Sequence, residues 1–219
     1  MTQDVAASKE GGDEAQRLAA LLLQPGRPVR PQRNFPPALL LKAQPVRAAV
    51  FDVDGCLTDG RITIGADGEQ VKAFNTLDGH GIKLLARGGI TPVVITGRDS
   101  AAVRRRCADL GVTEALFGVH DKLQAGAQVL ARLGLGWDQL AVIGDDWPDL
   151  PLLTRCALAC APAQAHQEVR AVCHHVTESL GGHGAAREFC DLLLVGRGVY
   201  ASLLAGHLTT LDSGRIDTR

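Results

Sequence analysis

Five short runs along the chain are apolar at almost every position, and they constrain the fold more than any other feature. The runs are Val46–Phe51, Thr91–Ile95, Ala115–Phe117, Leu140–Ile143 and Ala157–Ala159. Short runs without polar alternation are typical of strands buried on both faces. Between them, apolar residues return at helical spacing, as Val103, Cys107 and Leu110 do. This alternation predicts an α/β fold, a doubly wound parallel sheet with helices on both faces.

A different pattern lies between the first two runs. Arg61–Ile64 and Gln70–Asn75 flank the turn residues Gly65-Ala66-Asp67-Gly68, which predicts a β-hairpin. We therefore expect a domain over residues 47–196 with a hairpin insert at residues 61–75. This insert is too short to form a lid over a site by itself.

The two ends of the chain differ in composition from this domain. Residues 1–46 hold six of the ten prolines, which predicts an irregular or disordered extension. Within it, Asp13–Leu23 could form a short helix, and the arginines between the prolines could touch an anionic partner. Residues 197–219 are expected to form a C-terminal tail.

Charge, apolar runs and cysteine pattern exclude some classes of partner and indicate the compartment. Lys and Arg number 23 against 24 Asp and Glu, so no overall field favours a nucleic-acid backbone. No apolar run approaches the roughly 20 residues of a membrane span, and the first residues lack the pattern of a secretion signal. The six cysteines form no CxxC pair, which favours reduced thiols. We expect a cytoplasmic protein without a membrane or nucleic-acid partner.

Polar residues follow the predicted strands where a parallel sheet binds its ligands, at the carboxyl ends. They are Asp52 and Asp54 after the first strand, Thr96, Gly97 and Arg98 after the second, Lys122 after the third, and Asp145, Asp146 and Asp149 after the fourth. Each has an ordinary explanation as a turn residue, a helix cap or a solvated lysine. Together they converge on one point and suit a divalent cation and a phosphate.

The motifs FDVDG, VVITGR, the Lys of HDKL and VIGDDWPD occur in the order of the haloacid dehalogenase superfamily, which the chain resembles from Val46 to Leu194. DVDGCLTDG, KAFNTLDGHGIKLL, ITGRDS and GGHGAAREFCDLLL are more closely similar to one family of its small phosphatases. That family acts on 3-deoxy-D-manno-octulosonate 8-phosphate, carries a hairpin in place of a cap domain and is usually tetrameric.

The resemblance implies a magnesium-dependent phosphatase with an aspartyl-phosphate intermediate. Asp52 would attack phosphorus, and Asp54 would act as the acid and then the base. Asp52, Asp145 and the main-chain carbonyl of Asp54 would hold the magnesium ion. Thr96 and Lys122 would contact the phosphoryl group. The remaining carboxylates of the fourth motif, Asp146 and Asp149, would hold their loop in shape.

Substrate contacts are implied for a larger set of residues. They are Asp54, Lys72, Asn75, Thr76, Leu77, Asp78, Gly79, Lys83, Gly97, Arg98, Arg106 and Lys122. Leu77 stands where some relatives have a basic residue, and His183 interrupts a segment that often reads Gly-Gly-Arg-Gly. His80 and His183 could line the pocket, although structural or surface roles are favoured.

Several alternatives remain at this stage. The substrate could be a nine-carbon, sialic-acid-type sugar acid phosphate, since such relatives share the motifs. A phospho-acceptor module is disfavoured because Asp54 would promote hydrolysis of the acyl phosphate, and a silent scaffold is disfavoured by the full carboxylate set. The apolar hairpin residues predict a homo-oligomer in which one subunit covers its neighbour's pocket and brings Lys72 near the substrate. The resemblance implies that this oligomer is a tetramer.

Overall fold

The computed structural model describes residues 17, 20, 27–66 and 68–208. Gln32–Leu203 form one compact unit. The predicted helix Asp13–Leu23 lies outside the described residues except at two positions.

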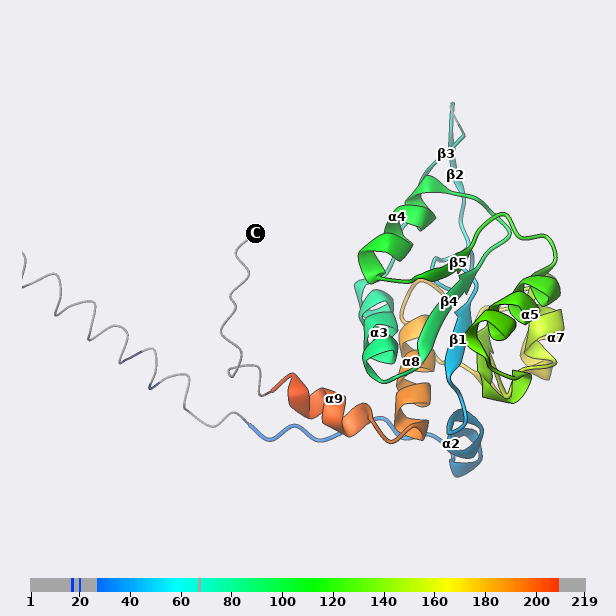
Figure 1. The fold of residues 1–219 in the computed structure, drawn as a ribbon. Coiled ribbons are helices and arrows are strands. Elements are labelled where there is room, and N and C mark those ends of the chain that lie inside the picture. Colours follow the sequence, from blue (N-terminus) through cyan, green and yellow to red (C-terminus); the bar gives the residue numbers. More distant parts are fainter. Residues whose placement is uncertain (1–16, 18–19, 21–26, 67, 209–219) are drawn as a thin grey trace, which may run out of the picture. The chain divides into compact units, whose positions relative to one another are not determined.

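A parallel sheet of six strands forms the centre of the larger unit (Figure 1). Its order is β5-β4-β1-β6-β7-β8. The strands are β1 (Ala48–Phe51), β4 (Thr91–Ile95), β5 (Glu114–Leu116), β6 (Leu140–Ile143), β7 (Leu158–Ala161) and β8 (His175–Val176). In the centre, Phe51 of β1 pairs with Val94 of β4 and Ile143 of β6. The predicted doubly wound parallel sheet is therefore confirmed, with β8 as an additional edge strand.

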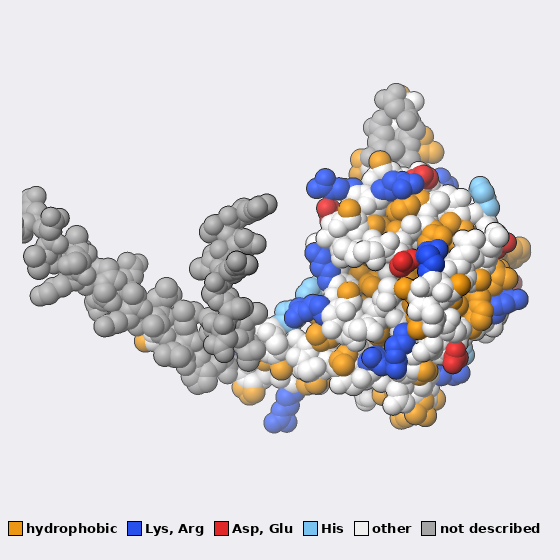
Figure 2. Space-filling view, in the orientation of Figure 1, with side chains coloured by type: hydrophobic (Ala, Val, Ile, Leu, Met, Phe, Trp, Pro, Cys, Tyr) orange, Lys and Arg blue, Asp and Glu red, His pale blue; other side chains and the backbone are white. Residues whose placement is uncertain are grey.

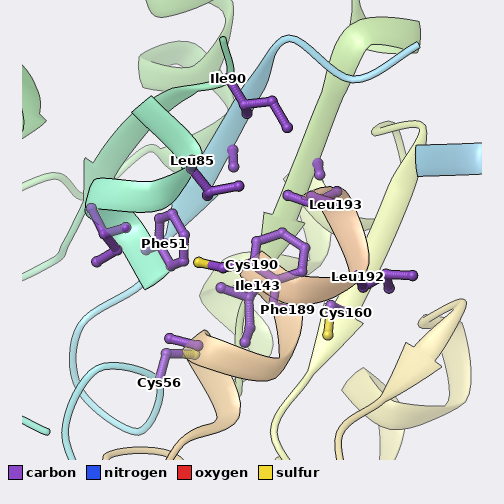
Figure 3. Packing of buried hydrophobic residues seen from close by; sticks show 14 of the residues in the cluster. Phe51, Cys56, Leu85, Ile90, Ile143, Cys160, Phe189, Cys190, Leu192 and Leu193 are labelled. Atoms are coloured by element: carbon purple, nitrogen blue, oxygen red, sulfur yellow. The ribbon is translucent and has the colours of Figure 1, made fainter. Parts of the chain in front are cut away.

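Helices cover both faces of the sheet. One face packs against α2 (Pro37–Ala43), α3 (Thr76–Arg87), α4 (Ala101–Leu110) and α8 (Ala185–Gly196). The other face packs against α5 (Lys122–Leu133), α6 (Leu150–Leu153) and α7 (Gln167–Val172). Successive β1 residues alternate between the faces, so that Phe51 contributes to the first cluster and Val50 to the second. Phe51 meets Phe189 of α8 edge to face, with ring centroids 5.5 Å apart (Figure 3).

The predicted hairpin is present but shorter than expected. It consists of β2 (Thr63–Gly65) and the antiparallel strand β3 (Gly68–Val71). Figure 1 shows it extending away from the sheet. Ile64 is 75% exposed and Val71 62% exposed, so the hairpin carries apolar surface that the described residues of the chain leave open.

The prediction of an irregular segment over residues 1–46 is wrong for residues 37–43, which form α2. Pro36 is the N-cap of this helix and Pro37 its first residue, where the missing N–H and fixed φ of proline are tolerated. Leu39 and Ala43 are buried against the core, and Phe35 packs edge to face on His175. The compact unit therefore begins before residue 47.

The segment after α8 contains a helix, whereas the sequence predicts only a C-terminal tail. The helix α9 covers Tyr200–Gly206, and Val199, Tyr200 and Leu203 pack against the core. Within the described part of the chain, no single helix has the length and apolar composition to cross a membrane. The pair α8 and α9 meets that test only when the two are joined across a sharp bend, and α8 is largely buried in the core.

Candidate active site

Loops at the carboxyl ends of β1, β4, β5 and β6 enclose a cavity of about 410 Å³. Its lining residues are Asp52, Asp54, Thr96, Gly97, Arg98, Val119, His120, Lys122, Asp145, Asp146, Pro148 and Asp149. The expected convergence of the four motifs is therefore present in the structure. His120 also lines the cavity, although it is not among the predicted site residues. Its position just before Asp121 and Lys122, after the third predicted strand, could have indicated this.

A buried lysine joins two carboxylates on the floor of the cavity. Lys122 is the first residue of α5, whose N-cap Asp121 accepts a hydrogen bond from the main-chain N–H of Gln124. Nζ of Lys122 donates to Oδ1 of Asp52 and to Oδ1 of Asp149, at 2.6 Å each. All three side chains are less than 10% exposed. Asp52 is held with one oxygen on the ammonium group, which fixes its orientation.

The ammonium group of Lys122 does not balance the charge of the carboxylates around it. Burial raises the pKa of Asp52 to about 6, and the charge of Asp149 adds to the rise although Lys122 opposes it. Burial and then the charges of Asp52 and Asp149 raise the pKa of Asp145 to about 8. For Lys122, burial acts to lower the pKa, but the two bound carboxylates outweigh it and raise the pKa above its usual value. The site therefore has an excess of negative charge in a poorly solvated position.

This donor set fits a hard divalent cation. Carboxylate oxygens of Asp52 and Asp145 and the Sγ of Cys56 lie within 4.8 Å of one another. Burial raises the pKa of the Cys56 thiol well above its ordinary value. A hard divalent cation prefers the carboxylate oxygens of this group to the sulfur. Close packing at Gly55 brings the two loops together: a Cβ there would lie 2.0 Å from Oδ2 of Asp145. Gly55 also has φ of +93°, which favours glycine.

Asp54 faces two cationic side chains. Lys72, which follows β3, forms an ion pair with Oδ1 of Asp54. Arg98 Nε lies 3.6 Å from Oδ2 of Asp54. Lys72 thus pairs with a residue that lines the cavity of its own chain, whereas we expected it to approach the pocket of a neighbouring subunit.

Thr96 and Asp149 shape the walls of the cavity from two further loops. Thr96 is 1% exposed, and its Oγ1 accepts a hydrogen bond from the main-chain N–H of Arg98 at 3.3 Å. Asp149 Oδ2 accepts from the main-chain N–H groups of Asp145 and Asp146, at 3.2 and 3.4 Å. The expected role of Asp149 in holding its loop matches these contacts.

Most residues expected to bind substrate from α3 lie elsewhere. Asn75 Oδ1 accepts from the main-chain N–H of Leu77 and caps α3. Buried Asp78 accepts from the main-chain N–H groups of Gly184 and Arg187, so it caps α8. A separate small pocket is lined by Leu57, Phe74, Asn75, Asp78, Gly79, Ile82, Arg106 and Leu110. The remaining members of that set, Thr76, Leu77 and Lys83, are exposed on α3, as are His80 on α3 and His183 before α8.

Known proteins with similar sequences and structures identify the family. A phosphatase of Escherichia coli named 3-deoxy-D-manno-octulosonate 8-phosphate phosphatase KdsC is 41% identical over 160 residues, which cover 73% of this chain and 85% of the relative. The chain belongs to the haloacid dehalogenase superfamily. The model of the haloacid dehalogenase-like hydrolases matches residues 118–189. With relatives named phosphatases, this superfamily member is a phosphoric monoester hydrolase.

Two solved structures of the superfamily match along most of the chain. A probable YrbI family phosphatase from Pseudomonas syringae is 46% identical with a TM-score of 0.75, and the match covers 80% of this chain and 98% of the other. A 3-deoxy-D-manno-octulosonate 8-phosphate phosphatase from Moraxella catarrhalis, solved with magnesium, phosphate and a KDO molecule, is 35% identical with a TM-score of 0.76. That match covers 78% of this chain and 98% of the other.

The metal-free protein is expected to lose stability as the pH rises. The native pKa of Asp145 lies near 8 against an ordinary value of 3.8, so between these values the native state binds more protons than the unfolded state. Stability then falls with rising pH. We expect the melting temperature in EDTA to fall by at least about 3 °C from pH 5 to pH 8, and magnesium to restore it. Differential scanning calorimetry measures this, and Asp145→Asn should flatten the slope. A flat profile in the unmodified protein would contradict the charge excess.

Proposed function

We propose that this protein is a magnesium-dependent phosphatase that hydrolyses 3-deoxy-D-manno-octulosonate 8-phosphate to the free sugar acid and phosphate. The observation that carries the proposal is Asp52, held by buried Lys122 and lying beside Asp145 at the sheet edge. Relatives named for this substrate supply the substrate class. The reaction would take place in the cytoplasm and serve the synthesis of lipopolysaccharide precursors.

The chemistry follows from the positions of the two aspartates of the first motif. A carboxylate oxygen of Asp52 attacks phosphorus, and the bond from phosphorus to the sugar oxygen breaks as Asp54 gives that oxygen a proton. Asp54 then takes a proton from water, which attacks the aspartyl-phosphate, releases phosphate and restores Asp52. Lys72 and Arg98 hold the side chain of Asp54 toward the cavity.

The remaining groups of the cavity stabilise negative charge. Lys122 keeps Asp52 in position and offsets its charge, and the Thr96 hydroxyl donates to a phosphoryl oxygen. Magnesium held by Asp52, Asp145 and the main-chain carbonyl of Asp54 would supply positive charge against the phosphoryl oxygens. Arg98, with a side chain 53% exposed at the cavity mouth, suits the carboxylate of a sugar acid.

Phosphate release from a panel of sugar acid phosphates tests the proposal. With magnesium present, we expect kcat/KM for the eight-carbon substrate to exceed that for a nine-carbon analogue and for simple sugar phosphates by at least about tenfold. Exhaustive chelation should abolish release, and added magnesium should restore it. If the enzyme prefers the nine-carbon compound, that compound replaces the eight-carbon one as the proposed substrate. Undiminished phosphate release after chelation would overturn the role of the metal.

The hairpin supports a second part of the proposal, self-association as a homotetramer. Ile64 and Val71 present apolar surface on a short two-stranded element, which is marginal in water unless it is packed against something. Orange side chains are visible at the base of the projection that the hairpin forms in Figure 2. Pairing of hairpins between subunits would bury this surface and leave Lys72 in its own pocket.

Replacing Ile64 and Val71 together by serine is expected to reduce the oligomer to smaller species at micromolar concentration. The two changes remove apolar contact area while keeping Lys72 and its ion pair with Asp54. Multi-angle light scattering gives the mass, and the matched control is serine at Val29, an exposed residue outside the hairpin. An unmodified protein that is monomeric at the same concentration would contradict the tetramer.

A further inference from the structure

The segment after β7, residues 162–166, contacts both loops that carry the expected metal ligands. Gln164 Nε2 donates to the main-chain oxygen of Gly55 at 2.7 Å. The main-chain N–H of His166 donates to the main-chain oxygen of Asp145 at 2.8 Å. Gly55 directly follows Asp54 in the chain. The segment therefore links the loop of Asp52 and Asp54 to the loop of Asp145.

The oxygen of the Gln164 side-chain amide also forms a hydrogen bond. Oε1 of Gln164 accepts from the main-chain N–H of Gly181 at 2.9 Å. The next residue, Gly182, donates its main-chain N–H to the oxygen of Cys56 at 3.0 Å. We call Ser179–Gly182 the brace, because it lies against the backbone of the first loop. A Cβ at Gly181 would lie 1.7 Å from the Gly55 oxygen, so the two backbones are in direct contact.

A buried carboxylate holds the brace from the side of α8. Glu188 is 3% exposed, and its two oxygens accept from the main-chain N–H groups of Glu178 and Ser179 at 3.2 and 3.4 Å. The ring of His175 lies 2.9 Å from the same carboxylate. The brace is thus fixed to the core by groups that lie outside the cavity.

Gly55 is consequently enclosed on two sides. The brace and Gln164 lie against its carbonyl oxygen, and the carboxylate of Asp145 occupies the space where its side chain would be. A shift of the Gly55 peptide would move the Asp54 carbonyl on one side and the Asp145 carboxylate on the other. Gln164 is the side chain that bonds the Gly55 oxygen and the brace together.

We propose that Gln164 is a positioning residue that sets the separation of the Asp54 and Asp145 loops and thereby the affinity for the divalent cation. The inference rests on the proposed function only in placing magnesium between these loops. Gln164 itself is exposed, so its loss should disturb this geometry more than the stability of the fold. The GGHG segment then supports the loop of Asp52 and Asp54 through its first two glycines.

Two variants test the two hydrogen bonds of the Gln164 side-chain amide. Gln164→Leu removes both hydrogen bonds, whereas Gln164→Glu keeps an acceptor for Gly181 and turns a carboxylate oxygen toward the Gly55 oxygen. Both should weaken magnesium binding by about tenfold in isothermal titration calorimetry, as loss of an outer hydrogen bond to a metal site does. Both should lower kcat severalfold with KM within twofold. The matched control is Gln167→Leu, an exposed glutamine at the start of α7.

Hydrogen exchange on the metal-free protein provides a readout that needs neither metal nor substrate. We expect amides in residues 53–58 to exchange at least fivefold faster in Gln164→Leu than in Gln167→Leu, with melting temperatures within about 3 °C of the unmodified protein. Unchanged exchange would overturn the inference even if the phosphatase activity is confirmed. So would a wild-type affinity for magnesium in both Gln164 variants, or activity lost only in proportion to unfolding. If the unmodified protein cleaves no sugar acid phosphate, the proposed function fails, while exchange and metal titration still decide the role of Gln164.

Discussion

Replacing Asp52 by asparagine is expected to lower turnover by roughly 10⁴-fold or more, the size of effect seen when an essential nucleophile is removed. The change deletes the attacking oxygen and keeps the volume of the side chain. Because Lys122 retains Asp149 as a partner and burial already disfavours the charge of Asp52, the fold should remain stable. Steady-state phosphate release measures the turnover, and thermal denaturation checks the fold.

Asp146→Asn is the matched control for this prediction. Asp146 lines the same cavity and its charge helps to raise the pKa of Asp145, so its substitution removes a negative charge without removing the nucleophile. Turnover of this variant should stay within about tenfold of the unmodified enzyme. Beryllium fluoride should bind the unmodified protein and not Asp52→Asn. Near-normal turnover of Asp52→Asn would reject the aspartyl-phosphate mechanism.

Replacing Lys122 by methionine is expected to destabilise the protein by about 3–5 kcal/mol at pH 8, because it leaves two buried carboxylates without their counterion. For a chain of this size, that loss corresponds to a fall in melting temperature of roughly 10 °C. Turnover should fall as well, since Asp52 loses the group that orients it. The loss of stability should be smaller at pH 5, where Asp52, with its pKa near 6, takes up a proton.

The double variant Lys122→Met with Asp149→Asn tests whether uncompensated buried carboxylates cause this loss of stability. It removes one of the two carboxylates along with the ammonium group, so a large part of the lost stability should return. Chemical denaturation of the single and double variants gives the coupling energy between the two positions. A single variant that unfolds within 1 kcal/mol of the unmodified protein would contradict a buried ion-pair network.

The sheet and the cavity could be predicted from sequence because both follow from local pattern and one topological rule. Buried strands such as Leu140–Ile143 need apolar residues on both faces, and their order along the chain with helices between them leaves few arrangements. Once the sheet is parallel, residues that follow its strands must meet at one edge. Asp52 and Lys122 lie 70 positions apart in the chain and still meet at this edge.

Residues whose partners come from unrelated segments could not be predicted in this way. Asp78 looks like a substrate ligand within its motif, but it caps a helix that begins more than 100 residues later. Gln164 belongs to no recognised motif, and its hydrogen bonds exist only because the brace and the first loop meet in the fold. Pro36 and Pro37 read as breakers of regular structure, although a proline at the first turn of a helix is tolerated when its apolar face has a surface to cover.

The central place of β1 has a consequence for synthesis on the ribosome. This strand is translated early, but its two neighbours in the sheet follow later, and β6 begins about 90 residues after it. At about 5–20 residues per second, this central strand waits roughly 5–20 s for its second partner. Over that interval its apolar side chains and unpaired backbone edge are open to other chains, so folding in the cell depends on how well this one segment is shielded while the rest of the domain is still being made.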